Sequence, residues 1–210
     1  MNTVDVATVP RRRGSLIAIE GIDQAGKRTQ AHFLAARIRR NGVAVSVWNF
    51  PDYTTPLGQQ LRAYLAGRIR LDTHAVHLLY AANKWEVANE LKRRIRNGES
   101  IIVNRYTPSN VAYGLAHGVP EAWLVSLEEG LPKPDAVVLL DISPRTSAGR
   151  KSRGRDLHEG NLAYLKRVRR EYLRLAKRHG WVIIDGSRDP KEVRTFIWLK
   201  LAPILRLRTR

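Results

Sequence analysis

The segment that most constrains the fold is a short apolar run, Leu16–Glu20, followed directly by the glycine-rich sequence GIDQAGK at residues 21–27. The pattern Gly-x-x-x-x-Gly-Lys between a strand and a helix is typical of a loop that binds the phosphate chain of a nucleotide. The glycines permit a tight backbone path, and the amino end of the following helix attracts an anion. The candidate phosphate-binding residues are therefore Gly21, Ile22, Asp23, Gln24, Ala25, Gly26, Lys27, Arg28 and Thr29.

Strand-like apolar runs alternate with helical patterns along the chain. The expected strands are Leu16–Glu20, Val43–Phe50, Ser100–Asn104, Ala136–Asp141 and Trp181–Asp185. The expected helices are Lys27–Arg40, Asp72–Asn97, Pro108–His117, Glu121–Glu128, Gly160–His179 and Pro190–Leu207. This alternation predicts a three-layer α/β/α fold around a mostly parallel five-stranded sheet, with ligands bound at the carboxyl ends of the strands.

The composition limits the classes of protein that the chain can represent. At 210 residues we expect one domain, residues 1–210, in which residues 1–13 are flexible. The chain has no cysteine, which excludes disulfides and thiolate metal sites, and no apolar run of the roughly 18 residues that a membrane span needs. The first residues lack the apolar segment of a signal peptide, so we expect a cytoplasmic protein without a membrane partner.

The net charge of +18 is the unusual feature of the composition, and arginine dominates it with 28 residues against 9 lysines. One interpretation is a surface that attracts nucleotides or binds nucleic acid nonspecifically. The other is a general bias toward arginine, or a host that grows at high temperature. The basic residues are scattered over most of the expected helices, and no nucleic-acid-binding motif accompanies them, which favours the second interpretation.

Five further segments follow the loop in a definite order. They are FPD at residues 50–52, HLLYAANKWE at 77–86, NRYTPSNVAY at 104–113, GLPKPD at 130–135 and RKSRGRDLHE at 150–159. Through these segments the chain resembles the thymidylate kinase family over residues 15–190. The resemblance implies a P-loop NTPase fold with a mobile lid at residues 150–158, and transfer of the γ-phosphate of ATP to dTMP to give dTDP. It also implies Mg²⁺ as cofactor and a homodimer.

The resemblance assigns further residues to the acceptor nucleotide. Tyr80 would stack on thymine, although an aromatic side chain at this position could instead belong to the core. Lys84 stands where the family has an arginine that donates to a thymine oxygen, and the amide of Asn110 would both donate and accept at the base edge. The remaining expected contacts are Phe50 in the Phe-Pro segment, Asp23 with the sugar 3′-hydroxyl, Tyr113 under the deoxyribose, and Arg105 and Tyr53 with the acceptor phosphate.

The lid segment carries several arginines, the kind of residue that neutralises a phosphoryl group during transfer. In the family the catalytic arginine comes either from the phosphate-binding loop or from the lid, and the loop position here is Gln24. We therefore expect the lid to supply it, while a solvated basic loop is the alternative. The expected catalytic residues are Lys27, Arg105, Arg153 as first choice in the lid, and Arg150 next.

Two positions depart from the family, and both bear on the binding of Mg²⁺. Arg28 replaces the hydroxyl residue that ligates the metal, and Asn104 replaces the usual aspartate. Thr29 does not take over the role of the hydroxyl, because it lies about 100° further round the helix. The metal ligands are therefore unknown, with Glu20, Asp23, Asn104 and Glu159 as candidates.

Three interpretations of these departures are open. The guanidinium of Arg28 partly replaces the metal charge, leaving a slow but real kinase. Alternatively, the protein is a catalytically impaired paralogue that binds nucleotides without efficient turnover. In the third interpretation, waters link Mg²⁺ to the acidic candidates and the activity is near normal.

Overall fold

The computed structural model describes residues 13–150 and 161–207, and its strands form a five-stranded sheet. The strands are β1 (Leu16–Glu20), β2 (Val45–Asn49), β3 (Ser100–Asn104), β4 (Ala136–Asp141) and β5 (Val182–Asp185). Their order is β2-β3-β1-β4-β5, and every neighbouring pair is parallel. The register places Ala18 between Val103 of β3 and Val137 of β4. All five expected strands are confirmed, although β2 and β5 are shorter than the apolar runs that predict them.

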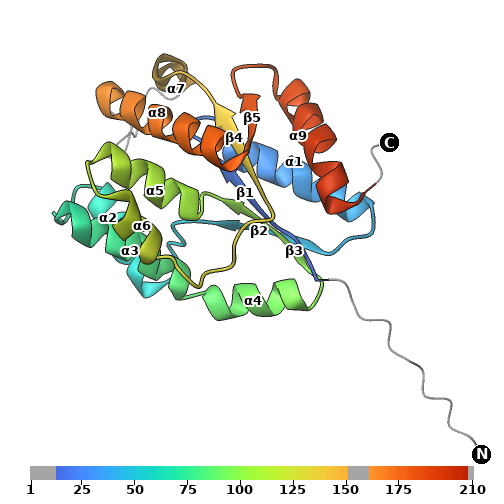
Figure 1. The fold of residues 1–210 in the computed structure, drawn as a ribbon, viewed down its shortest axis with the longest axis horizontal. Coiled ribbons are helices and arrows are strands. Elements are labelled where there is room, and N and C mark those ends of the chain that lie inside the picture. The colour runs from blue at the N-terminus through green and yellow to red at the C-terminus, as the bar shows by residue number, and fades with distance from the viewer. Residues whose placement is uncertain (1–12, 151–160, 208–210) are drawn as a thin grey trace, which may run out of the picture.

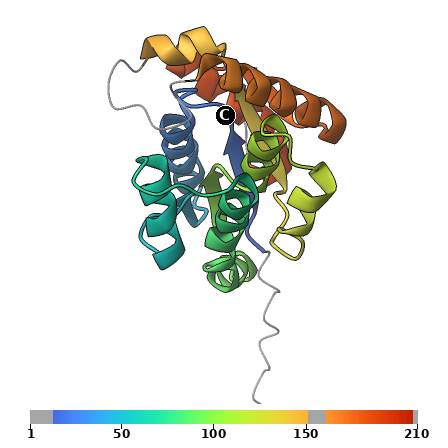
Figure 2. The same cartoon turned by 90° about the vertical axis from the view of Figure 1, so that its left-hand side faces the viewer.

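Helices cover both faces of this sheet. They are α1 (Lys27–Arg40), α2 (Pro56–Leu65), α3 (Thr73–Trp85), α4 (Ala88–Arg96), α5 (Thr107–Ala116), α6 (Glu121–Ser126), α7 (Pro144–Arg150), α8 (Leu162–His179) and α9 (Pro190–Leu205). Helices α1 and α9 pack on one face, whereas α4 and α8 lie on the other with α5 against α8 (Figures 1 and 2). The predicted α/β/α fold is therefore confirmed. No helix in the described part of the chain has the length and apolar character needed to cross a bilayer.

The central strand β1 explains where ligands bind. All five of its residues are buried, as expected for a parallel strand that helices cover on both faces. Ile17 and Ile19 belong to the core cluster that includes α1, whereas Leu16 and Ala18 pack in the cluster that includes α4. The strand order reverses at β1, because β3 lies on one side of it and β4 on the other. In such sheets a crevice opens beyond the carboxyl ends of the strands at this point.

The segment Asp72–Asn97, predicted as one helix, consists of two helices that part at residues 86–87. Helix α3 packs against α2 and α5, whereas α4 packs against β3, so the chain changes direction between them. At this break the carboxylate of Glu86 accepts a hydrogen bond from the Thr55 hydroxyl at 2.6 Å, just before α2. Tertiary contacts therefore override a continuous helical pattern.

The sequence pattern does not predict helices α2 and α7, although both carry a start signal. At α2 the hydroxyl of Thr55 accepts a hydrogen bond from the Gly58 amide at 3.1 Å, and proline occupies the first turn. At α7 the hydroxyl of Ser143 accepts from the Thr146 amide at 3.0 Å. The Thr-Pro and Ser-Pro pairs at their starts are the local signals that could have indicated them.

Candidate active site

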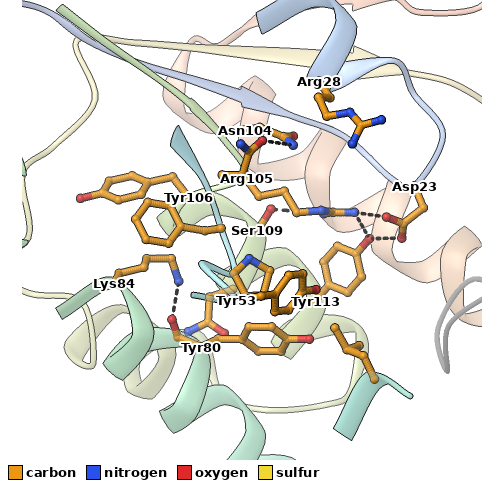
Figure 3. A pocket seen from close by; sticks show the side chains of 15 residues that line it. Asp23, Arg28, Tyr53, Tyr80, Lys84, Asn104, Arg105, Tyr106, Ser109 and Tyr113 are labelled. Carbon is orange, nitrogen blue, oxygen red and sulfur yellow. Dashed lines mark hydrogen bonds and ion pairs between the residues drawn. The ribbon is translucent and has the colours of Figure 1, made fainter. Parts of the chain in front are cut away.

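A cavity of 380 Å³ lies at the carboxyl ends of the central strands, and many of the residues singled out in the sequence meet there (Figure 3). Those that line it are Asp23, Arg28, Phe50, Tyr53, Tyr80, Lys84, Asn104, Arg105, Asn110 and Tyr113. They come from the loop after β1, the start of α1, the segment after β2, helix α3, the end of β3 and helix α5. Parallel strands bring these segments to one edge of the sheet.

The loop between β1 and α1 follows the tight backbone path that its glycines predict. Gly21 has a φ of +138°, and a Cβ there would come within 2.4 Å of the Leu140 carbonyl oxygen, so only glycine fits. Ile22 and Ala25 are 2% and 3% exposed, which anchors the loop to the core. The Lys27 Nζ donates to the Ile22 carbonyl at 2.8 Å and so lies across the loop. Helix α1 begins with no side-chain cap and no acidic residue in its first turn, which keeps its positive end favourable to an anion.

Helix α7 holds the same loop from the other side. The Ser147 hydroxyl donates to the Asp23 carbonyl oxygen at 2.8 Å. The Arg150 guanidinium donates to the carbonyl oxygens of Gln24 at 3.0 Å and Gly186 at 2.9 Å. Arg150, expected as a lid cation, therefore lies beside the phosphate-binding loop. The other lid residues, among them Arg153, Arg155 and Glu159, lie outside the described residues.

Arg105 enters the cavity from a sharp turn at the end of β3. Its φ is +64°, and its backbone amide donates to Ile19 of β1 at 3.1 Å, which sets the side chain beside the loop. The guanidinium forms an ion pair with Asp23 and donates to the Tyr113 hydroxyl at 2.9 Å. That hydroxyl in turn donates to the second carboxylate oxygen of Asp23 at 3.0 Å.

The electrostatics of Asp23 follow from this arrangement. Burial alone would raise the pKa of Asp23, but the charges of Arg105 and Lys27 outweigh it and hold that pKa well below its usual range. Asp23 is therefore ionised at neutral pH. Its charge offsets that of Arg105, which is only 16% exposed.

Glu20 forms a buried support behind Arg105. One carboxylate oxygen accepts from the Tyr106 amide at 2.8 Å, and the other accepts from the hydroxyls of Ser109 at 2.6 Å and Tyr172 at 2.9 Å. The Ser109 hydroxyl also accepts from Arg105 at 3.3 Å. Sequence reasoning missed Ser109 and Tyr172 as site residues. Ser109 lies inside the motif at residues 104–113, whereas Tyr172 occupies an apolar face of α8 and carries no separate signal.

The residues that the structure describes do not form a protein-held Mg²⁺ site. Both oxygens of Glu20 and of Asp23 already accept hydrogen bonds. Asn104 donates to Asn49 at 3.0 Å, which leaves its buried Oδ1 as the one oxygen of these three residues without a partner. No group of three or more acidic, histidine or cysteine side chains suited to a metal occurs in residues 13–150 and 161–207. Because Mg²⁺ needs a near-octahedral shell of oxygens, one amide oxygen is not enough.

The far end of the cavity contains a second buried ion pair. The Lys84 Nζ donates to Glu128 at 2.7 Å and to the Tyr80 carbonyl at 2.9 Å, and the side chains of Lys84 and Glu128 are each 4% exposed. Burial raises the pKa of Glu128 although Lys84 opposes this. Nothing in the sequence pattern indicates Glu128. Lys84 keeps one further N–H, since an ammonium group has three donors.

Asn110 is held by α3 rather than standing free in the cavity. Its side-chain oxygen accepts from His77 Nδ1 at 2.7 Å, and its nitrogen donates to the His77 carbonyl at 3.2 Å. The other ring nitrogen of His77 lies 3.2 Å from His117 Nδ1, so a buried polar chain supports the amide. Phe50, predicted at the substrate, is 6% exposed and packs on Tyr106 with ring centroids 5.7 Å apart.

Comparison with known proteins gives the chain its family. The family model described as thymidylate kinase matches residues 19–197. The thymidylate kinase of Danio rerio is 37% identical over 185 residues and that of Homo sapiens 34% over 185 residues, with 87% of each chain covered in both cases. A solved structure of thymidylate kinase from Candida albicans superposes with a TM-score of 0.82 and 29% identity, covering 91% of this chain and 92% of that one. The chain therefore belongs to the thymidylate kinase family.

Proposed function

We propose that the protein transfers the γ-phosphoryl group of ATP to dTMP, giving ADP and dTDP. Family membership makes it an ATP-dependent phosphotransferase. The observation that carries the choice of acceptor is the cavity itself. One end adjoins the phosphate-binding loop through Arg105, and the other presents the ring of Tyr80 and the ammonium of Lys84.

The donor side would use the loop between β1 and α1. Its backbone amides and the positive end of α1 suit the ATP phosphates, and Lys27 would exchange the Ile22 carbonyl for a phosphate oxygen. Arg150 lies within hydrogen-bond distance of the loop backbone, so a small rotation would bring it to a phosphate. Arg153 would likewise contribute a positive charge to the transferred phosphoryl group. Phosphoryl transfer relies chiefly on such positioning and charge neutralisation.

The acceptor side would bind dTMP along the length of the cavity. Arg105 would hold the acceptor phosphate, whose oxygen is the nucleophile and needs no strong general base. Asp23 and Tyr113, joined by a hydrogen bond, would meet the sugar. Tyr80 would stack on thymine, and the remaining N–H of Lys84 would donate to a thymine oxygen.

Three further residues contribute to the acceptor side of the cavity. Tyr53 would join Arg105 at the phosphate, because it lines the same cavity. Both ends of the Asn110 amide already bind His77. Asn110 would therefore contact the base edge only through the hydrogen-bonding capacity that its amide has left. Phe50 would contribute an apolar wall rather than a polar contact.

Mg²⁺, expected from the resemblance, would enter with ATP. This ion is commonly bound by substrate phosphates and waters with few protein ligands, which agrees with the lack of a protein-held site among the described residues. We also propose a single domain that acts in the cytoplasm as a homodimer. The absence of cysteine agrees with a reducing compartment.

A coupled ADP-release assay with ATP, Mg²⁺ and dTMP, run across temperature, tests the proposal. Turnover with dTMP that exceeds turnover with dUMP, dGMP and AMP is the expected result. Lys27→Ala should abolish it, whereas Lys200→Ala, an exposed lysine of α9, should not. If dTMP binds by calorimetry but no ADP forms, the chain is the impaired paralogue. If dTMP neither binds nor reacts, the acceptor is wrong.

A further inference from the structure

The cavity carries one positive charge that no described residue neutralises. The charged side chains that line it are Asp23, Arg28, Lys84 and Arg105. Asp23 pairs with Arg105, and Lys84 pairs with Glu128. Arg28 forms no hydrogen bond or ion pair with the residues of ranges 13–150 and 161–207. Among the four charged side chains that line the cavity, the unneutralised charge is therefore that of Arg28.

The position of Arg28 directs this charge to the phosphate end of the cavity. The residue lies in the first turn of α1, directly after Lys27, and its side chain is exposed. In Figure 3 its guanidinium lies at the end of the cavity that Asp23 and Arg105 mark, away from Lys84. A phosphate or another anion could neutralise a guanidinium placed there.

Two neutral amide side chains, those of Asn49 and Asn104, also line the cavity that Arg28 lines. Asn49 and Asn104 line the same wall and bind one another through their amides at 3.0 Å. An acidic side chain at position 104 would compete for the guanidinium, but the amide does not. Arg28 is therefore available to a ligand, whereas Arg105 reaches any ligand with much of its charge already offset by Asp23.

We propose that Arg28 binds the phosphate of the acceptor nucleotide together with Arg105, and that this makes acceptor binding independent of a divalent metal ion. A guanidinium can donate two parallel hydrogen bonds to a phosphate, which gives both charge and orientation. The inference rests on the proposed function, because it takes dTMP as the acceptor. It also gives a physical reason for Arg28, which stands where the family has a residue whose hydroxyl ligates the metal.

Calorimetry in EDTA, without ATP, tests this inference separately from turnover. The proteins are the wild type, Arg28→Ser and Arg40→Ser, a control that removes the same charge from an exposed residue at the other end of α1. The ligands are dTMP and thymidine, which lacks the phosphate. We expect Arg28→Ser to weaken dTMP binding by about tenfold or more, as for loss of a charge-assisted hydrogen bond. Thymidine binding should not change, and Arg40→Ser should change neither.

Each other outcome overturns the inference. Equal dTMP affinity in wild type and Arg28→Ser would show that Arg28 does not reach the phosphate. An equal loss for dTMP and thymidine would mean that the substitution disturbs the pocket rather than a phosphate contact. A wild type that binds dTMP only when Mg²⁺ is added would show that the metal supplies the charge. A wild type that binds dTMP under neither condition would remove the proposed function as well.

Discussion

The two ends of the cavity handle charge differently. At the phosphate end, Asp23 neutralises Arg105, and Arg28 is left over as an exposed cation. At the base end, Glu128 neutralises Lys84, both side chains are 4% exposed, and no other described residue that lines this end is charged. The first end can therefore attract an anion, whereas the second discriminates by stacking and hydrogen bonds.

The difference follows from what each end must bind. A phosphate group carries its own charge, so the protein needs a net positive charge there. A thymine ring is neutral, and an unpaired ammonium beside it would carry a desolvation cost with nothing to offset it. The buried pair lets Lys84 offer a donor with fixed direction but without net charge.

Removal of Arg105 should have the largest effect on the difference in charge between the two ends of the cavity. Arg105→Ala leaves Asp23 with its charge and without its main partner, so the phosphate end loses its positive character. We expect turnover with dTMP to fall by about 1,000-fold or more, measured by ADP release. Arg93→Ala, which removes an exposed arginine of α4, is the control. Wild-type-like turnover in Arg105→Ala would refute the assignment of the acceptor phosphate.

Removal of Lys84 at the base end should lower the stability of the folded protein. Lys84→Met leaves Glu128 buried without a counter-charge, and we expect a loss of about 3–5 kcal/mol in the free energy of unfolding at pH 7. Denaturant titration measures it. The double variant Lys84→Met, Glu128→Leu should recover most of the loss, because no unpaired charge remains.

The stability loss of the single variant Lys84→Met should depend on pH, and the direction of this dependence follows from Glu128. Burial raises the pKa of Glu128 above its ordinary value of 4.5, so folding favours the protonated carboxyl. The penalty is absent below the unfolded-state pKa, where Glu128 is protonated in both states, and grows as the pH rises above it. The stability deficit of Lys84→Met should therefore be small near pH 4 and large at pH 7. A deficit independent of pH would mean that lost packing, not charge, causes it.

Substitution of Tyr80 should weaken the base end without affecting charge. Tyr80→Ala removes the stacking surface, and we expect dTMP affinity to fall by about 1–3 kcal/mol, measured by calorimetry. Tyr80→Phe keeps the ring and serves as the matched control, with affinity close to wild type. If both variants lose affinity equally, the hydroxyl rather than the ring makes the contact.

The smallest expected effect concerns the neutral side chain of Asn104 at the phosphate end. Asn104→Asp places a carboxylate on the wall that Arg28 shares. In EDTA we expect dTMP affinity to fall by roughly two- to fivefold, because the new charge partly offsets that of Arg28. The effect should vanish in the Arg28→Ser background. The same loss in both backgrounds would show that the two positions do not interact.

Local sequence was enough for the framework of the site. The buried runs of β1, β3 and β4 have the bounds that their apolar residues predict, and Gly21 stands where only glycine fits. The apolar runs and the positive φ of Gly21 are properties of short segments, whereas the close approach of the Leu140 carbonyl to Gly21 comes from the tertiary structure. The break between α3 and α4 could not be predicted in this way, because each helix buries its apolar side against a different partner.

The sequence names most of the residues that line the cavity, but only the tertiary structure decides which of their charges are neutralised. The motifs name Arg105, Lys84 and Asn110, yet their partners Asp23, Glu128 and His77 lie 82, 44 and 33 positions away along the chain. A sequence pattern records which ionisable groups exist, and only packing decides which of them meet in a buried, weakly polar environment. For this reason the sequence alone identifies Arg28 as the replacement of a metal ligand. In the folded protein, Arg28 is the cation that no other described residue lining the cavity neutralises.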